Sequence, residues 1–110
     1  MTDLVDLKVL GSKHGDYKIN RNGDVYDTIK GVFLEHKIDK RRNLKYVRIR
    51  LNLCGIKITR PHYIHQLLAQ QFLENPYDLY FAVKHIDNNK LNNNLDNLMW
   101  YKKAGGAVIQ

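Results

Sequence analysis

The sequence predicts an α+β fold, in which a small antiparallel β-sheet is followed by an amphipathic helix and then by two strands around a polar loop. Three patterns support this. The dipeptide Asn22-Gly23 stands between two short apolar segments, residues 45–53 alternate between apolar and polar side chains, and apolar residues recur every three to four positions over residues 62–74. With 110 residues the chain is long enough for one domain and too short for two.

The charge of the chain indicates an anionic partner. Eighteen lysines and arginines against eleven acidic residues give a formal net charge of +7. A small domain with this balance most often faces nucleic acid, although an acidic protein surface would also attract it. A single cysteine, Cys54, excludes an intramolecular disulfide and a four-cysteine zinc site. Because the amino terminus lacks an apolar run, we expect a cytoplasmic protein without a membrane segment.

The first strands are expected within residues 16–60. Asn22-Gly23 favours the positive φ angles of a tight turn, which predicts a hairpin over residues 16–26. A second hairpin is predicted from the alternation of residues 45–53, the break at Cys54-Gly55 and the resumed alternation of residues 56–60. One face of this hairpin is apolar, with Val47, Ile49, Leu51 and Leu53, and the other is basic.

Basic residues of this half are the first candidates for nucleic-acid contacts. The sheet contributes Lys45, Arg48, Arg50 and Lys57, and the preceding loop contributes Lys40, Arg41 and Arg42. Such residues contact phosphates and carry little sequence information, and the alternative is a face and a loop that are merely solvated. Tyr46, on the basic face, is a candidate for stacking on bases, whereas Trp100 fits the core better.

The predicted helix follows Pro61, a residue suited to a first helical turn, and ends at Asn75-Pro76. The residues Ile64, Leu67, Leu68 and Phe72 form its apolar stripe, which leaves Gln66, Gln70 and Glu74 near solvent. His62 and His65 are three residues apart on this helix and could share a metal. A core imidazole bonded to the backbone is the more ordinary interpretation of His65.

An asparagine-rich stretch, residues 86–96, separates two apolar runs at residues 79–83 and 97–101. Asparagine side chains bond to nearby backbone groups, so a dense set of them can hold a compact loop in one shape. Ile86, Leu91, Leu95 and Leu98 would anchor this loop to the core, which favours an ordered loop over a flexible polar tract.

The run Val83-Lys-His-Ile-Asp-Asn-Asn-Lys-Leu-Asn-Asn-Asn-Leu-Asp-Asn-Leu-Met-Trp100 resembles the active-site motif of HNH homing endonucleases of the phage and intron type. Residues 63–76 resemble the helix that precedes this motif, and residues 17–26 resemble the amino-terminal DNA-contacting segment. The resemblance implies a ββα-metal core, built from two strands, a loop and a closing helix. It also implies a single HNH-like domain over residues 1–110, with a basic sheet (16–60), a helix (61–75) and the motif (79–104).

By this resemblance His85 is the general base that activates water, and Asn97 fixes the loop and orients the histidine ring. Mg²⁺ or another divalent cation would bind if the protein is active. Two ligand positions depart from the family pattern: Lys84 stands before the histidine, and two glycines stand where the closing helix should carry an Asn or His. Because paired glycines disfavour a helix, we expect the closing helix to be short or missing. Asp87 is the nearest carboxylate that could replace them. Lys84, and Lys90 in the loop, could instead bind phosphate.

Two functions follow from these observations. The first is a metal-dependent, DNA-nicking phosphodiester hydrolase that grips the duplex with its basic sheet. The second is a catalytically degenerate HNH fold that needs no cofactor. Such a fold would serve as a DNA-binding module, or as a phage or mobile-element inhibitor, for example a counter-defence protein, that docks on a nucleic-acid-handling complex. Retention of His85, Asn97 and the asparagine loop favours the first function, and the substituted ligand positions favour the second.

Overall fold

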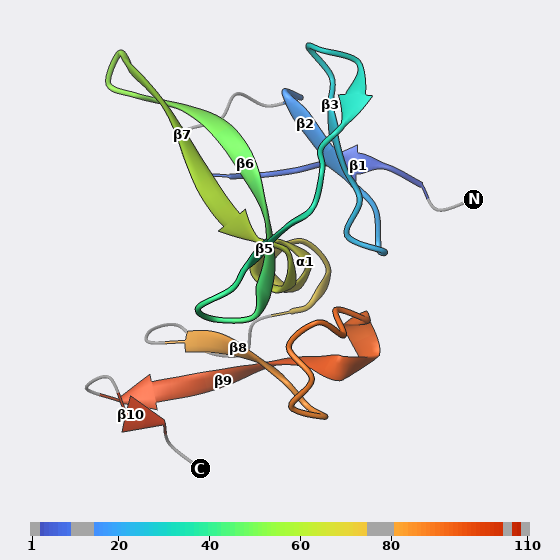
Figure 1. Ribbon diagram of the computed structural model, residues 1–110, viewed down its shortest axis with the longest axis vertical. Coiled ribbons are helices and arrows are strands. Elements are labelled where there is room, and N and C mark those ends of the chain that lie inside the picture. Colours follow the sequence, from blue (N-terminus) through green and yellow to red (C-terminus); the bar gives the residue numbers. More distant parts are fainter. Residues whose placement is uncertain (1–2, 10–14, 75–80, 105–106, 109–110) are drawn as a thin grey trace.

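The computed structural model describes residues 3–9, 15–74, 81–104 and 107–108, and it confirms the α+β class. Strands form three small antiparallel sheets around the helix α1 (Ile64–Phe72), which lies at their centre (Figure 1). Every strand pair is antiparallel. No helix among the described residues is long and apolar enough to cross a membrane.

The amino-terminal sheet has the order β1-β2-β3-β4, from the strands β1 (Val5–Asp6), β2 (Tyr17–Ile19), β3 (Val25–Asp27) and β4 (Val32–Phe33). The predicted first hairpin is β2–β3, but its loop is wider than a two-residue turn, because Ile19 pairs with Val25. The Asn20 side chain closes this loop by accepting hydrogen bonds from the backbone N–H groups of Asn22 and Asp24, both at 3.0 Å. Gly23 alone takes the positive φ that we expected of Asn22-Gly23, at +87°.

The central sheet has the order β5-β6-β7, with β5 (Lys37–Asp39), β6 (Leu44–Leu53) and β7 (Ile56–Tyr63). Cys54 and Gly55 both have positive φ, 52° and 86°, as a two-residue hairpin turn requires. Val47, Ile49 and Leu51 are buried as predicted. Leu53, the last apolar position of the alternation, is 39% exposed, because it pairs with the exposed Ile56 next to the turn, at the end of the hairpin.

The helix is shorter than predicted. Pro61 belongs to β7, opposite Arg48, because the pairing of β6 with β7 continues as far as Tyr46 and Tyr63. A strand at the edge of a sheet tolerates the missing N–H of proline. The predicted stripe holds, since Ile64, Leu67 and Leu68 are at most 1% exposed. Asn75-Pro76 lies outside the described residues.

The carboxy-terminal sheet consists of β8 (Phe81–His85), β9 (Leu98–Ala104) and β10 (Ala107–Val108), with one turn of 3-10 helix at Leu95–Asn97 before β9. The polar loop falls between β8 and β9 as predicted, and the first two residues of the predicted strand at 79–83 lie outside the described residues. The helix α1 packs against β6 and β7 of the central sheet and also against β8 and β9 of this one. Just after α1, the Leu73 carbonyl accepts the indole N–H of Trp100, on β9, at 3.2 Å.

Candidate functional site

Asn97 is the centre of a hydrogen-bond network that holds the asparagine-rich loop in one shape. Its amide oxygen accepts the Asp87 backbone N–H at 3.0 Å, and its amide nitrogen donates to the Asp87 carboxylate and to the Asn92 carbonyl, both at 2.9 Å. Leu98 anchors the end of the loop in the core, whereas Ile86, a predicted anchor, is 54% exposed. The loop is therefore fixed mainly by polar contacts and at one end by apolar burial.

The Asp87 carboxylate accepts three hydrogen bonds from residues of this loop. One oxygen accepts from the Asn89 backbone N–H at 2.8 Å and from Asn97, and the other accepts from the Asn92 side chain at 3.0 Å. These bonds, led by the one from Asn92, hold the pKa of Asp87 below its usual value. Both oxygens therefore accept hydrogen bonds from loop donors, so Asp87 helps to hold the loop, and its use as a metal ligand stays a prediction.

His85 ends β8 and is only 7% exposed. Its Nε2 lies 2.7 Å from the side-chain oxygen of Asn93. An amide oxygen only accepts hydrogen bonds, so this orientation of Asn93 assigns the ring proton to Nε2 and the lone pair to Nδ1. The residue that orients the ring is thus Asn93. Asn97, for which we expected that contact, acts one step away by shaping the loop.

A second histidine, His65 on α1, lies against His85. The two ring centroids are 4.9 Å apart, His65 is 5% exposed, and its Nδ1 has no hydrogen-bond partner among the described residues. Burial, and secondly the positive charge that His85 can carry, lower the pKa of His65 to about 4. His65 is therefore a neutral ring that packs beside His85. The backbone bond that we expected for it is not made by Nδ1.

The two lysines of the motif point to different surroundings. Lys84 is exposed and lies between the buried residues Val83 and His85, so the alternation of the strand directs it to the other face of β8. Lys90 reaches across to the loop between β5 and β6, where its ammonium donates to the Arg42 carbonyl at 3.2 Å. This bond connects the asparagine-rich loop to the basic loop.

Only part of the predicted basic face remains free for a ligand. Arg48 and Lys57 are exposed and lie on one face of the β6–β7 hairpin. Lys45 does not lie there, because it alternates in phase with the buried Val47 and so belongs to the opposite face.

Arg50 is engaged within the protein. Its guanidinium forms two bonds to the Asp27 carboxylate, at 2.6 and 3.1 Å, and Asp27 is completely buried. The bond from Arg50 is the main cause that lowers the pKa of Asp27. The predicted phosphate contact of Arg50 is therefore replaced by an ion pair that joins the central sheet to the amino-terminal sheet.

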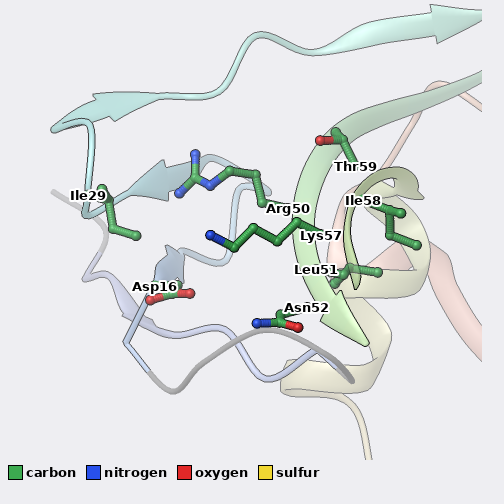
Figure 2. A pocket seen from close by; sticks show the side chains of 8 residues that line it. All are labelled: Asp16, Ile29, Arg50, Leu51, Asn52, Lys57, Ile58 and Thr59. Carbon is green, nitrogen blue, oxygen red and sulfur yellow. The ribbon is translucent and has the colours of Figure 1, made fainter. Parts of the chain in front are cut away.

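Figure 2 shows Arg50 and Lys57 side by side in a cleft of about 520 Å³ between these two sheets. Asp16 and Ile29 approach from the amino-terminal side, and Asn52 lines the floor.

Arg41 and Arg42 lie in the turn after β5. Their backbone N–H groups donate to the Asp39 carboxylate at 3.0 and 3.4 Å, which leaves both guanidinium groups at the surface. The Arg42 guanidinium stands 6.0 Å from the ring centroid of Tyr63. This turn is a basic corner beside the asparagine-rich loop.

The donor groups of this site do not fit a hard divalent cation. The described residues contain no cluster of three or more His, Cys, Asp and Glu side chains. The Asp87 oxygens already accept three hydrogen bonds from the loop, and Lys84 is a cation at a position where the ββα-metal pattern requires an oxygen donor.

Comparison with known proteins identifies relatives of this chain. Residues 62–108 match the family model described as HNH endonuclease. An uncharacterized HNH endonuclease of Acanthamoeba polyphaga mimivirus is 39% identical over 87 residues, which are 79% of this chain and 24% of that protein. The DNA endonuclease I-HmuI of Bacillus phage SP01 is 34% identical over 96 residues, which are 87% of this chain and 52% of that protein.

The fold of I-HmuI is also similar. The solved structure described as DNA binding and cleavage by the HNH homing endonuclease I-HmuI aligns with a TM-score of 0.68 and 34% identity, over 91% of this chain and 52% of that one. This chain thus spans about half or less of the length of these relatives.

Proposed function

This chain belongs to the HNH endonuclease family, and from that premise we propose that it binds duplex DNA and hydrolyses a phosphodiester bond in one strand, in the manner of a homing endonuclease. The observation that carries the proposal is the setting of His85. A buried imidazole, held by Asn93 through Nε2, keeps Nδ1 as a proton acceptor at the edge of an ordered loop. We expect His85 to be the general base and Asn93 and Asn97 to be positioning residues.

The chemistry assigned to His85 is proton removal. As a water oxygen attacks the phosphorus, its proton passes to Nδ1, the bond from the phosphorus to one sugar oxygen breaks, and that oxygen leaves as an alkoxide that takes a proton from solvent. The bond from Nε2 to Asn93 keeps the ring from turning. Imidazole is the side chain most often used as a general base, which suits this task. The neutral ring of His65 fills the space behind His85 and keeps water out of that side.

DNA binding is assigned to the exposed basic groups. Arg48 and Lys57 on the sheet, with Arg41 and Arg42 at the corner and Lys90 in the loop, would contact the phosphates of one duplex. Because these contacts release counterions, affinity should fall steeply as salt rises and should depend little on sequence.

HNH nucleases generally use divalent metal ions. Mg²⁺ or a similar cation would polarise the phosphate when bound. The donor set of the described residues does not fit such an ion, so no step of the proposal uses one. Lys84 at the substituted ligand position gives the second candidate function its support, namely an HNH fold that binds DNA without cutting it.

The relatives belong to a giant virus and a phage, which makes the interior of an infected cell the expected setting. A protein complex that handles nucleic acid is the remaining expected partner. It gains support only if the chain binds no DNA.

The test combines nicking of supercoiled plasmid in Mg²⁺ or Mn²⁺ with a gel shift on the same DNA in EDTA. Three proteins are compared: the wild type, His85→Ala, and His62→Ala as a control that removes a surface histidine near the same helix. We expect His85→Ala to abolish nicking and to change DNA affinity less than about twofold, while His62→Ala keeps both.

The outcomes separate the two functions. Nicking that survives in His85→Ala contradicts the assigned base. A wild type that shifts DNA without nicking it supports the binding module. Failure of the wild type to shift DNA even at low salt refutes both.

A further inference from the structure

A second cleft, of about 340 Å³, lies on the same face of the β6–β7 hairpin as the cleft in Figure 2, opposite to the buried Val47 and Ile49, and the two clefts share no lining residue. Its floor is a pair of tyrosines, Tyr46 on β6 and Tyr63 on β7, which face each other in the strand register. Directly opposed residues of antiparallel strands share one face, so both tyrosines line this face of the sheet. Arg48 and Pro61, the next opposed pair in the register, extend the floor.

Cations stand over this aromatic floor. The guanidinium of Arg48 lies 5.9 Å from the Tyr46 ring centroid, and that of Arg42 lies 6.0 Å from the Tyr63 ring centroid. Lys40 lines the rim, and among the described residues neither its ammonium nor the Tyr46 hydroxyl has a hydrogen-bond or ion-pair partner. Flat aromatic surfaces with free cations at the rim form the combination that binds single-stranded nucleic acid by stacking on bases and pairing with phosphates.

One acidic residue, Asp39, also lines the cleft. Its carboxylate accepts the Tyr63 hydroxyl at 2.8 Å and two backbone N–H groups, and the charge of Arg42 acts on it as well, so the anion is held by these donors and by a neighbouring cation. The same bond fixes the Tyr63 side chain, and Tyr63 is therefore ready to stack without losing side-chain freedom on binding.

The cleft is next to the proposed catalytic histidine. The Tyr63 ring lies 5.9 Å from the His65 ring, and His65 in turn lies 4.9 Å from His85. The bond from Lys90 to the Arg42 carbonyl joins the rim of the cleft to the asparagine-rich loop. When a phosphate of a DNA strand lies at His85, a neighbouring nucleotide of the same strand would therefore lie at this cleft.

We propose that the Tyr46–Tyr63 cleft holds one unstacked nucleotide of the bound DNA, with its base on the tyrosines and its phosphate at Arg48 and Lys40. A volume of about 340 Å³ is within the range of small-ligand sites, about 300–1,000 Å³. The inference rests on the proposed DNA binding and deepens it, because the protein would bind DNA with one unstacked nucleotide more tightly than a regular duplex.

The test measures affinity in EDTA for three labelled duplexes: fully paired, with one bulged nucleotide, and with the same bulge lacking its base. We expect the wild type to bind the bulged duplex about five- to tenfold more tightly than the paired one, the low end of what base–aromatic stacking contributes. Removing the base from the bulge should remove most of this preference.

Tyr46→Leu should lose the preference while binding the paired duplex as before, and Tyr46→Phe, which keeps the ring, should retain it. Tyr101→Leu is the matched control, because Tyr101 is a half-buried tyrosine on β9, outside this cleft and outside residues 17–26. Thermal unfolding of each variant shows that it is folded. Equal affinity of the wild type for all three duplexes, or a preference that survives in Tyr46→Leu, contradicts the proposed role of the cleft but not the proposed DNA binding. Absence of binding to every duplex contradicts both proposals.

Discussion

The ion pair between Arg50 and Asp27 should contribute to stability and not to DNA binding, and Arg50→Met separates the two roles. The substitution leaves Asp27 buried without its cation, and removing one partner of a buried pair costs about 3–5 kcal/mol. Two features reduce the cost here. Arg50 is 38% exposed, so water can replace part of it, and Asp27 keeps backbone N–H donors from Ile29 and Lys30 at 3.0 and 3.1 Å.

We therefore expect Arg50→Met to lower the free energy of unfolding at pH 7 by about 2–3 kcal/mol. In a domain near this size that corresponds to a fall of about 10–20 °C in Tm. Urea titration followed by circular dichroism measures the free energy. Arg48→Met is the matched control, since Arg48 lies on the same strand and face and has no ion pair among the described residues. It should cost less than about 1 kcal/mol and should weaken DNA binding, which Arg50→Met should leave nearly unchanged.

The pH dependence of this difference follows from the lowered pKa of Asp27, which Arg50 causes. A carboxyl with a depressed pKa in the folded state contributes stability that is present above its unfolded pKa, near 3.8, and is lost as pH falls through its folded pKa. The wild type and Arg50→Met should therefore converge in stability below about pH 4. A loss under about 1 kcal/mol at pH 7, or a difference unchanged between pH 7 and pH 3, would refute this reasoning.

Three further variants test the packing around the site. Gly23→Ala should lower stability by at least about 1–2 kcal/mol in thermal unfolding, because Gly23 has φ +87° and an added Cβ would stand 2.8 Å from the Ile64 side chain; an unchanged Tm would contradict it. Asn97→Ala should cost about 1–3 kcal/mol and speed hydrogen exchange of the Asp87 amide, which loses its acceptor; equal exchange rates would count against the network. The pKa of His65 is about 4 in the folded protein and 6.5 in the unfolded chain, so its contribution to the free energy of unfolding is present above pH 6.5 and is lost as the pH falls toward 4. His65→Phe should therefore reduce the loss of stability between pH 7 and pH 5, and an equal loss in both proteins would argue against a neutral His65.

The strands and the helix could largely be predicted because each depends on local patterns. Alternation located the β6–β7 hairpin, since side chains of a half-buried strand must alternate, and spacing located the buried stripe of α1. Pro61 misplaced the helix start, because proline suits both a first turn and an edge strand, and only the pairing with Arg48 decides between them.

The contacts within the site depend on residues far apart in the sequence, so the sequence alone could not assign them. Nothing in the run Asn92-Asn-Asn94 indicates that the middle residue meets His85, because three identical side chains differ only in direction. The approach of His65 to His85 and of Arg50 to Asp27 likewise needs the packing of separate elements. The resemblance to HNH enzymes did identify the loop, because a family motif carries its own geometry with it.

The central position of α1 has a consequence for how DNA and protein adapt to each other. The helix contacts β6 and β7 on one side and β8 and β9 on the other, and Gly23 abuts it from the amino-terminal sheet. The Lys90–Arg42 bond fastens the two halves again at the surface. In the described part of the chain, these contacts join the basic sheet to the histidine loop at two places. We expect the strain of fitting the two surfaces together to fall on the DNA, so that sites that bend easily are favoured even where no base is touched.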